Sequence, residues 1–204
     1  MKKPTGTKEK LLEVAFDLIW DSSYGSVSVD DICKRAGVNK GSFYHFFPTK
    51  ADLAVEAYRA RWESVKPLVE QLFSRETPPI ERIQNWCNHV YRVQREQAEK
   101  YGHVCGCPFA SVGAELATQD EKIRASCEEL IYSGRKYVEG AIADAIQEGA
   151  VTVTDAALAA HRVYSVCLGM LFEAKVQNSL DVLKDLAPTV MDFLGVGAVV
   201  AAAH

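Results

Sequence analysis

Apolar residues recur along the chain at the three- and four-residue spacing of amphipathic helices, and the alternation typical of strands is essentially absent. The first such segment, residues 8–22, follows Thr7 as a possible N-cap and places Leu11, Ala15 and Ile19 on one face. The same spacing predicts further helices over residues 29–36, 40–47, 50–73, 80–100, 120–148, 154–178 and 180–194, with another beginning at Pro108. The predicted fold class is therefore all-α.

Capping residues mark the ends of two short helices near the N-terminus. Ser28 and Asp31 have the spacing of a capping box, with Asp31 in place of the usual Glu. Gly37 is suited to end the helix over residues 29–36 in the left-handed conformation, and Asn39 caps the next helix. Two short helices joined by so tight a turn are typical of a helix-turn-helix motif.

The second of these short helices has one apolar face and one polar face. The small core between the helices is expected to be filled by Ile32, Val38, Phe43 and Phe46. The other face carries Lys40, Ser42, Tyr44 and His45, with Gly41 allowing a close approach of the backbone. Such a helix can bind phosphates at its N-terminus while its side chains reach base edges in the major groove.

The distribution of charge favours the same interpretation. The chain of 204 residues has a net charge of −4, and its 48% of apolar residues excludes a disordered or collagen-like protein. Residues 1–50 hold eight cations and six acids, a net charge of +2, so the remaining residues carry −6. Between Ile32 and Ala51 there are four cations and no acid. A basic segment joined to an acidic body indicates that one end binds a polyanion.

Signals for export or membrane insertion are absent from the pattern. The first ten residues lack the apolar region of a secretion signal, and no stretch of about 18 clean apolar residues occurs. The chain is also large enough to form a core without disulfides, so its six cysteines are expected to be reduced thiols. These features predict a cytoplasmic protein that has no membrane partner.

The stretch VSVDDICKRAGVNKGSFYHFFPTKADL, residues 27–53, resembles the signature of the tetracycline-repressor (TetR) family of bacterial transcription regulators. The resemblance implies a DNA-binding domain over residues 1–50 and a helical effector-binding and dimerisation domain over residues 51–204. It further implies a homodimer that binds a palindromic double-stranded operator and is released by a small-molecule effector. The protein is then a regulator rather than an enzyme.

The family pattern assigns DNA contacts by position. Ser28 and Lys50 correspond to phosphate contacts, and Lys40, Gly41 and Ser42 lie at the start of the recognition helix. Tyr44 and His45 would contact bases or backbone, unless they are partly buried spacers, and Lys2 and Lys3 would form an arm near the minor groove.

The last two predicted helices are apolar on more than one face, so each needs a second partner. With the family resemblance, the favoured partner is a second copy of the chain in a four-helix interface. The residues expected in this interface are Leu158, Val163, Val166 and Met170 on one helix and Val182, Leu186 and Val190 on the next. The alternative is that the first of the two is simply a central core helix.

Candidate sensor chemistry lies in the segment from His103 to Pro108. With Pro108 as the first helical residue, the sulfur of Cys107 points toward free N–H groups, which stabilise a thiolate. The segment is similar to the N-ethylmaleimide-responsive branch of the family, which has a Gly-Cys at this junction and a lysine in the penultimate helix. These map to Gly106-Cys107 and Lys175, and the lysine would stabilise the thiolate or form a sulfenamide-type bond after oxidation.

Other interpretations of this segment remain open. The cysteines would instead line a pocket for a non-covalent ligand together with Trp62, Trp86, His89, Tyr164 and Phe172. Cys105, a second nearby thiol, permits a disulfide. A metal site through His103, Cys105 and Cys107 is disfavoured because it lacks the usual two-residue spacing and needs a fourth ligand. Neither a metal nor a cofactor is therefore expected.

A cysteine-dependent hydrolase is the rival function for the C-terminal body. Cys107 with His103 or His89 would supply a nucleophile and a base, but the sequence shows no acid to orient the base and no Gly-rich oxyanion loop. A helical scaffold for protein partners leaves the acid-free basic segment unexplained. A DNA-binding regulator accounts for more of the pattern than either.

Overall fold

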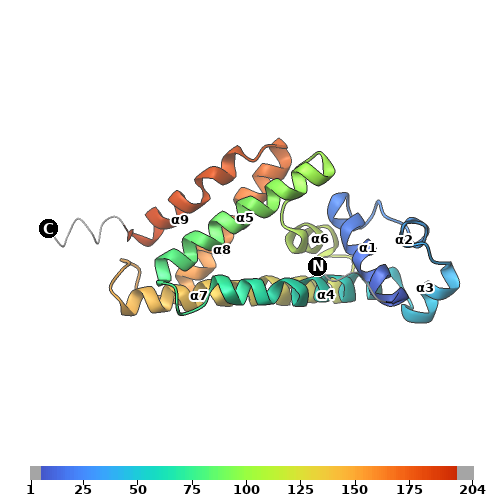
Figure 1. The fold of residues 1–204 in the computed structure, drawn as a ribbon, viewed down its shortest axis with the longest axis horizontal. Coiled ribbons are helices and arrows are strands. Elements are labelled where there is room, and N and C mark those ends of the chain that lie inside the picture. The colour runs from blue at the N-terminus through green and yellow to red at the C-terminus, as the bar shows by residue number, and fades with distance from the viewer. Residues whose placement is uncertain (1–5, 197–204) are drawn as a thin grey trace. The chain divides into compact units, whose positions relative to one another are not determined.

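The computed structural model describes residues 6–196 and is built of helices throughout that range (Figure 1). The expected all-α fold is confirmed. The α-helices are α1 (Thr7–Asp21), α2 (Val29–Ala36), α3 (Lys40–Phe46), α4 (Lys50–Leu72), α5 (Pro79–Tyr101), α6 (Pro108–Leu116), α7 (Glu121–Gln147), α8 (Ala156–Gln177) and α9 (Leu186–Leu194). The 3-10 helix η1 (Asp181–Asp185) precedes α9. The predicted arm of Lys2 and Lys3 lies outside the described residues.

The chain forms two compact units. The first consists of residues up to 67 together with residues 108–131, and the second of residues 68–107 together with residues from 132 onward. Helix α4 passes from the first unit to the second at Pro67, and the chain passes back between Cys107 and Pro108. The boundary predicted at residue 50, between a DNA-binding domain and an effector-binding domain, concerns function and stays a prediction.

In the first unit, α1, α2 and α3 pack on one another around a small apolar core. The side chains that are fully buried there include Leu11, Ile32, Phe43, Phe47 and Leu53. The sequence placed Phe46 and Val38 in this core, but both are only partly buried, and Phe47 fills the position expected for Phe46. Because Phe47 follows the last helical turn with extended backbone, helical spacing alone does not identify it.

The second unit has a larger core built from α5, α7, α8 and α9. Its fully buried residues include Ile83, Val138, Ile142, Val163, Leu186 and Leu194. An ion pair joins α5 to α7 beside this core, with Arg82 Nη1 at 2.8 Å from Asp144 Oδ2. The Arg82 side chain is only 5% exposed, so its charge depends on this partner for stabilisation.

Most of the predicted helix ends are correct to within two residues, and two details are wrong. The first helix includes Thr7, its N-cap residue is Gly6, and no side-chain hydrogen bond caps it. The single helix expected over residues 180–194 is divided into η1 and α9. Pro188 explains the division, because proline has no N–H and its ring clashes with the preceding turn, so it is accommodated only in the first turn of α9.

None of the helices of residues 6–196 combines the length and the apolar character that a membrane crossing needs.

Candidate nucleic-acid interface and sensor site

The turn between α2 and α3 has the geometry expected of a helix-turn-helix motif. Ser28 and Asp31 form a capping box, with the Asp31 amide donating to Ser28 Oγ over 3.1 Å. Gly37 ends α2 with φ +69°, a conformation that other residues adopt at a cost. Asn39 Oδ1 then accepts the Ser42 amide at 2.8 Å and fixes the start of α3. Local side-chain hydrogen bonds therefore determine the angle at which α3 begins.

Helix α3 buries one face and exposes the other. Phe43 is completely buried, and its ring contacts that of Tyr44 edge-on at 5.0 Å. Tyr44 itself is 57% exposed, a large fraction for an aromatic side chain. Lys40, Gly41 and His45 are exposed and Ser42 is partly so. The residues of α3 that the sequence assigned to DNA contact are thus all at least partly accessible.

Lys40 is the cation at the start of this face, and it pairs with an acid from α2. Its Nζ lies 2.7 Å from Asp30 Oδ1, and both side chains are more than half exposed. The hydrogen bond and charge of Asp30 raise the pKa of Lys40, so the ammonium stays charged. An exposed pair of this kind contributes little to stability, so Lys40 can exchange Asp30 for a phosphate.

Lys50 and Ser28, the two predicted phosphate contacts, are both engaged within the protein. Lys50 Nζ donates to the carbonyl oxygens of Tyr24 and Val27 at 2.7 and 2.8 Å and lies 3.8 Å from the centre of the Tyr24 ring. Burial lowers the pKa of Lys50. The Ser28 hydroxyl donates to Asp31. Both side chains therefore shape the motif, and their contact with phosphates stays a prediction.

The loop that carries the candidate sensor is held by two amide side chains. The Gln94 amide, buried in α5, donates to the Gly106 carbonyl at 3.1 Å and accepts from the Gly106 amide at 2.9 Å. Asn178, at the end of α8, accepts the Val104 amide at 2.9 Å. Gly106 has φ +72°, and a Cβ on it would lie 3.2 Å from Lys175 Cδ. These contacts fix the backbone immediately before Cys107.

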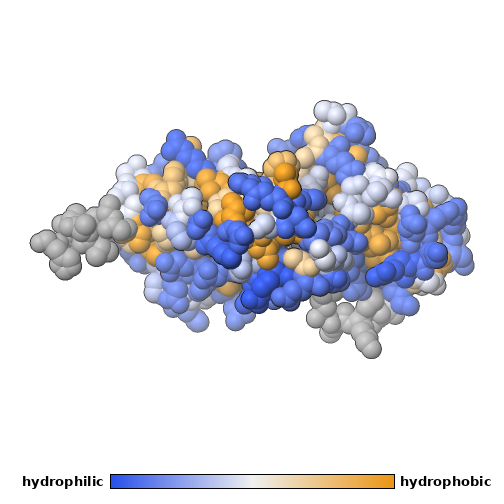
Figure 2. Space-filling view, turned by 90° about the horizontal axis from the view of Figure 1, so that it is seen from above, coloured by the Kyte–Doolittle hydropathy of each residue, from blue (hydrophilic) through white to orange (hydrophobic). Residues whose placement is uncertain are grey.

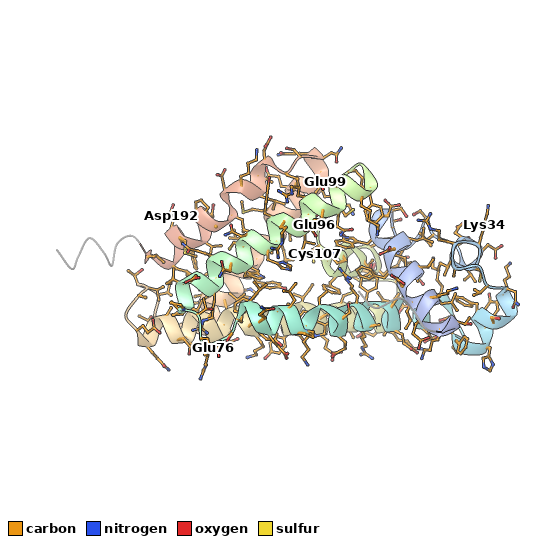
Figure 3. All side chains as sticks on the ribbon, viewed as in Figure 1. Lys34, Glu76, Glu96, Glu99, Cys107 and Asp192 are labelled. Atoms are coloured by element: carbon orange, nitrogen blue, oxygen red, sulfur yellow. The ribbon has the colours of Figure 1, made fainter. Side chains whose placement is uncertain are left out.

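Cys107 differs from the other five cysteines in being accessible. Cys33, Cys87, Cys105, Cys127 and Cys167 are buried to 95% or more, whereas Cys107 is partly exposed. It lies directly before α6, which begins at Pro108 as predicted (Figure 3). The Lys175 side chain packs along Gly106, the residue before Cys107, and the pairing of Lys175 with Cys107 stays a prediction.

Three other titratable groups of the same unit have raised pKa values. Burial raises the pKa of Cys167 well above the ordinary value, and the negative charge of an ionised Cys107 raises it further. The pKa of Tyr164 is raised by the same two causes in the same order. Burial also raises the pKa of Cys87 to about 12. These groups stay protonated near neutral pH, so they do not compete with Cys107 as nucleophiles.

The residues predicted to line an effector pocket are only partly brought together. Trp86 and Tyr164 stack with ring centres 5.8 Å apart, and burial lowers the pKa of the nearby His89 in the same unit. Phe172 is 70% exposed, so it does not line an enclosed pocket. Trp62 belongs to the other compact unit. Among the described residues, His103, Cys105 and Cys107 do not form part of a group able to hold a metal ion.

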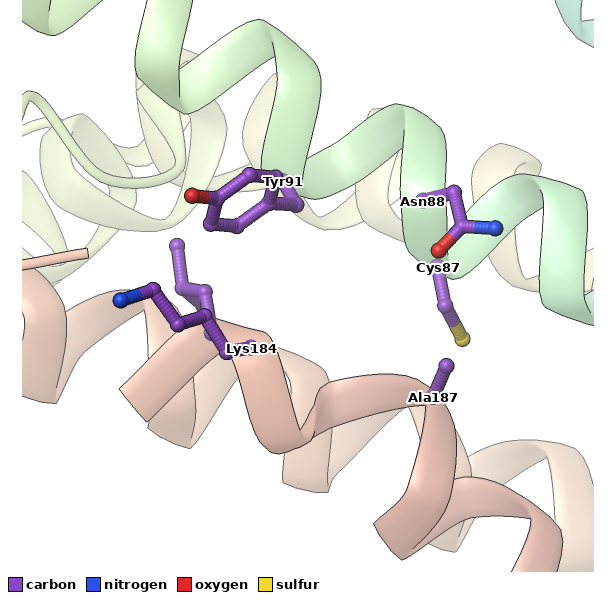
Figure 4. Close-up of a pocket in the computed structure, with 6 residues that line it drawn as sticks. Cys87, Asn88, Tyr91, Lys184 and Ala187 are labelled. Carbon is purple, nitrogen blue, oxygen red and sulfur yellow. The ribbon is translucent and has the colours of Figure 1, made fainter. Parts of the chain in front are cut away.

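A different pocket lies between α5 and the η1–α9 segment (Figure 4). Its volume is about 320 Å³, near the lower limit for small-molecule sites. It is lined by Cys87, Asn88, Tyr91, Leu183, Lys184 and Ala187. None of the predicted pocket residues is among them, because the sequence gives no indication of how α5 and α9 are paired.

The predicted dimer residues divide into buried and accessible groups. Val163, Leu186 and Val190 are at most 1% exposed within the single chain, so they fill its core and offer no surface to a second copy. Leu158 is 45% exposed, and Val166, Met170 and Val182 are partly exposed. Val176 on α8, which was not among the predicted interface residues, is 70% exposed. Figure 2 shows, on one face of the molecule, apolar patches among hydrophilic residues.

Comparison with known proteins identifies the family. The model for bacterial regulatory proteins of the tetR family matches residues 11–57, and the model for the tetracyclin repressor-like C-terminal domain matches residues 79–190. The chain belongs to the TetR family. The resemblance found in residues 27–53 is thereby confirmed, and so is the combination of an N-terminal helix-turn-helix domain with a helical C-terminal domain.

Two regulators align with nearly the whole chain. The HTH-type transcriptional repressor NemR of Escherichia coli K12 is 25% identical over 199 residues, 95% of this chain and 96% of NemR. An uncharacterised HTH-type regulator in the lacX 3' region of Lactococcus lactis is 26% identical over 195 residues, 93% of this chain and 95% of that protein. Both are regulators by name, in agreement with a TetR-family role in transcription.

Solved structures show the same fold. The crystal structure of E. coli NemR in its reduced form matches with a TM-score of 0.79 and 22% identity, covering 91% of this chain and 95% of that one. A TetR-family regulator from Agrobacterium tumefaciens matches with a TM-score of 0.83 and 17% identity, covering 94% and 99%.

Proposed function

We propose that this TetR-family regulator is a repressor that binds a palindromic operator as a homodimer and releases it when an electrophile or oxidant reacts with Cys107. The observation that carries the DNA-binding part is the accessible face of α3. Tyr44 stands 57% exposed beside Lys40 and His45 on a helix without acids, while Phe43 beneath them is completely buried. A recognition helix requires this arrangement, with a rigid apolar anchor below and polar side chains toward the groove.

The signal is proposed to be chemical modification of the Cys107 thiolate. With an electrophilic alkene such as a maleimide, the sulfur electron pair forms a new C–S bond. The displaced π electrons of the alkene take a proton from water. The support for this step is the accessibility of Cys107 among five buried cysteines and the packing of Lys175 beside Gly106. The similarity to NemR, a repressor whose solved structure is of a reduced form, supports it further.

The homodimer is proposed to form along α8. Leu158, Phe172 and Val176 are exposed at positions that share one helical face, and Gly169 lies between them on the same face. A Cβ on Gly169 would meet nothing within 4 Å in the single chain, so close packing inside this chain does not explain a glycine there. A small residue at this point instead lets a second α8 approach closely.

Replacing Phe172 with glutamate is expected to convert the dimer to a monomer, because a charge cannot be buried unpaired in an apolar interface. Sedimentation velocity should show half the molecular mass at the same protein concentration, with an unchanged helical content. Leu68→Glu is the matched control, because Leu68 is 39% exposed on α4 and lies outside the proposed face. A Phe172→Glu protein that sediments like the unaltered dimer contradicts this interface.

The proposed function is tested by titrating the protein into labelled duplex DNA taken from upstream of its own gene. Specific binding should persist in excess unrelated DNA, and its affinity should fall steeply with added salt, since phosphate contacts release counterions. Binding that is equal for unrelated DNA of the same length contradicts an operator-specific regulator.

A non-covalent effector is the second candidate for the signal, and the pocket between α5 and η1–α9 favours it. Its 320 Å³ is sufficient for a small ligand, and Asn88, Tyr91 and Lys184 offer polar groups to orient one. Release of operator by a reversible ligand with Cys107 unmodified would support this candidate over the covalent one.

A further inference from the structure

The carboxylate of Glu115, near the end of α6, holds the turn between α1 and α2. Its Oε2 accepts the Tyr24 amide at 3.0 Å and its Oε1 accepts the Gly25 amide at 2.7 Å. Both oxygens of one carboxylate are thus used on two consecutive backbone N–H groups, which lie some 90 residues earlier in the chain. Hydrogen bonds to an ionised acceptor are about twice as strong as neutral ones.

A lysine holds the same turn through its carbonyl groups. Lys50 Nζ donates to the Tyr24 and Val27 carbonyl oxygens and lies over the Tyr24 ring. The N–H groups of the turn therefore go to a carboxylate and its carbonyl groups to an ammonium. Burial, with the negative charges of Asp120, Glu115 and Asp52, raises the pKa of Tyr24, so its phenol stays neutral in this cluster. The backbone of residues 24–27 is fixed from both sides.

This turn leads directly into the DNA-binding motif. Val27 is buried, and the next residue, Ser28, is the N-cap of α2. Helix α2 in turn packs against α3. Whatever moves residues 24–27 therefore moves the start of α2, and with it the support of the recognition helix.

The other end of α6 adjoins the sensor. Helix α6 runs from Pro108 to Leu116, so its first residue is bonded to Cys107 and its penultimate residue is Glu115. A helix of nine residues is rigid compared with a loop, and a displacement of its first turn is carried to its last. The loop before it is held at Gly106 by Gln94, so a group added to Cys107 adjoins fixed backbone on the loop side.

We infer that Glu115 is the positioning residue through which α6 holds the α1–α2 turn, and that modification of Cys107 loosens the DNA-binding helices by displacing this carboxylate. The inference rests on the proposed function, since it explains how the signal at Cys107 reaches the operator-binding face. Glu115 itself is not proposed to contact DNA.

The two hydrogen bonds from the Tyr24 and Gly25 amides to Glu115 form a clamp on the α1–α2 turn. This clamp is tested by amide hydrogen exchange on the full chain without DNA. In Glu115→Gln one oxygen becomes an NH₂ donor that faces a backbone N–H, so the Tyr24 and Gly25 amides should exchange about tenfold faster or more. Glu121→Gln is the matched control, since it removes the same charge from an exposed residue whose partner is Arg124. It should leave both amides unchanged. Equal exchange in the two variants overturns the clamp.

The coupling is tested on the unaltered protein, so it does not depend on how well the variant folds. Alkylation of Cys107 with N-ethylmaleimide, verified by mass spectrometry, should accelerate exchange at Tyr24 and Gly25, and Cys107→Ser treated in the same way should show no change. Unchanged exchange in protein alkylated at Cys107 overturns the inference.

Operator binding measured on the same samples separates this inference from the proposed function. Faster exchange without weaker operator binding means that the coupling exists and the proposed release does not. Weaker operator binding without faster exchange means that release occurs by another route, and it overturns the role of Glu115. In Glu115→Gln, the ratio of operator affinities before and after alkylation should fall toward one, because the clamp is already open.

Discussion

Replacing Tyr44 with alanine is expected to weaken operator binding about a hundredfold, because a homodimer makes each contact of the recognition helix twice. A loss of about 1.4 kcal/mol at each half-site is a tenfold change, and two such losses multiply. Tyr44 is 57% exposed, so its removal should change the free energy of unfolding by no more than about 1 kcal/mol. Fluorescence anisotropy with the labelled operator measures the affinity, and thermal denaturation measures the stability.

Tyr132→Ala is the matched control for this experiment. Tyr132 is also an exposed tyrosine on a helix, at 46%, but it belongs to the second compact unit, whereas α3 belongs to the first. Its replacement should leave the operator affinity unaltered. If Tyr44→Ala and Tyr132→Ala bind the operator equally well, α3 does not contact DNA through this face.

Replacing Cys107 with serine is expected to abolish the response to N-ethylmaleimide while leaving operator binding intact. The serine hydroxyl is not ionised near neutral pH and does not add to an alkene, whereas the accessible thiolate does. In the unaltered protein, alkylation should release the operator almost completely. The fraction of bound DNA before and after treatment, together with the mass of the protein, measures this effect.

Cys105→Ala is the control for the choice of cysteine. Cys105 is completely buried two residues before Cys107, so the unaltered protein should not be alkylated there. Its alanine variant should respond to N-ethylmaleimide like the unaltered protein. Undiminished release in Cys107→Ser would instead favour the pocket between α5 and η1–α9 as the site of the signal.

The helix-turn-helix motif could be predicted from the sequence because its geometry is determined locally. The capping box of Ser28 and Asp31, the left-handed Gly37 and the cap at Asn39 each act within four residues. The start of α6 at Pro108 is local in the same sense, and it placed Cys107 correctly. Interactions between residues so close in the sequence can be predicted without the tertiary structure.

The exposed apolar face of α8 could be predicted only in part, because α8 is apolar on more than one side. Periodicity shows that such a helix has two partners, but it does not show which face belongs to which partner. Val163 therefore entered the predicted interface although it is buried in the core, and Val176 was missed although it is 70% exposed.

The contacts that position the two sites could not be predicted at all. The side chains of Glu115 and Gln94 form hydrogen bonds with backbone groups 90 and 12 residues away. Because backbone groups are the same in nearly every residue, the sequence does not show which of them a side chain binds. Lys50 illustrates the same problem. Its place in the family pattern indicated a phosphate contact, and nothing in the sequence indicated that it also holds the Tyr24 and Val27 carbonyl groups.

Hydroxyl-radical footprinting of the labelled duplex shows whether two copies of the α3 face bind one operator. Two recognition helices on a palindrome must occupy major grooves on the same side of the duplex, so we expect two symmetric protected clusters with centres about 10 base pairs apart, or a multiple of that spacing. Both clusters should disappear together in Tyr44→Ala. A single cluster, or an unchanged footprint in that variant, would mean that two α3 helices do not bind the operator together.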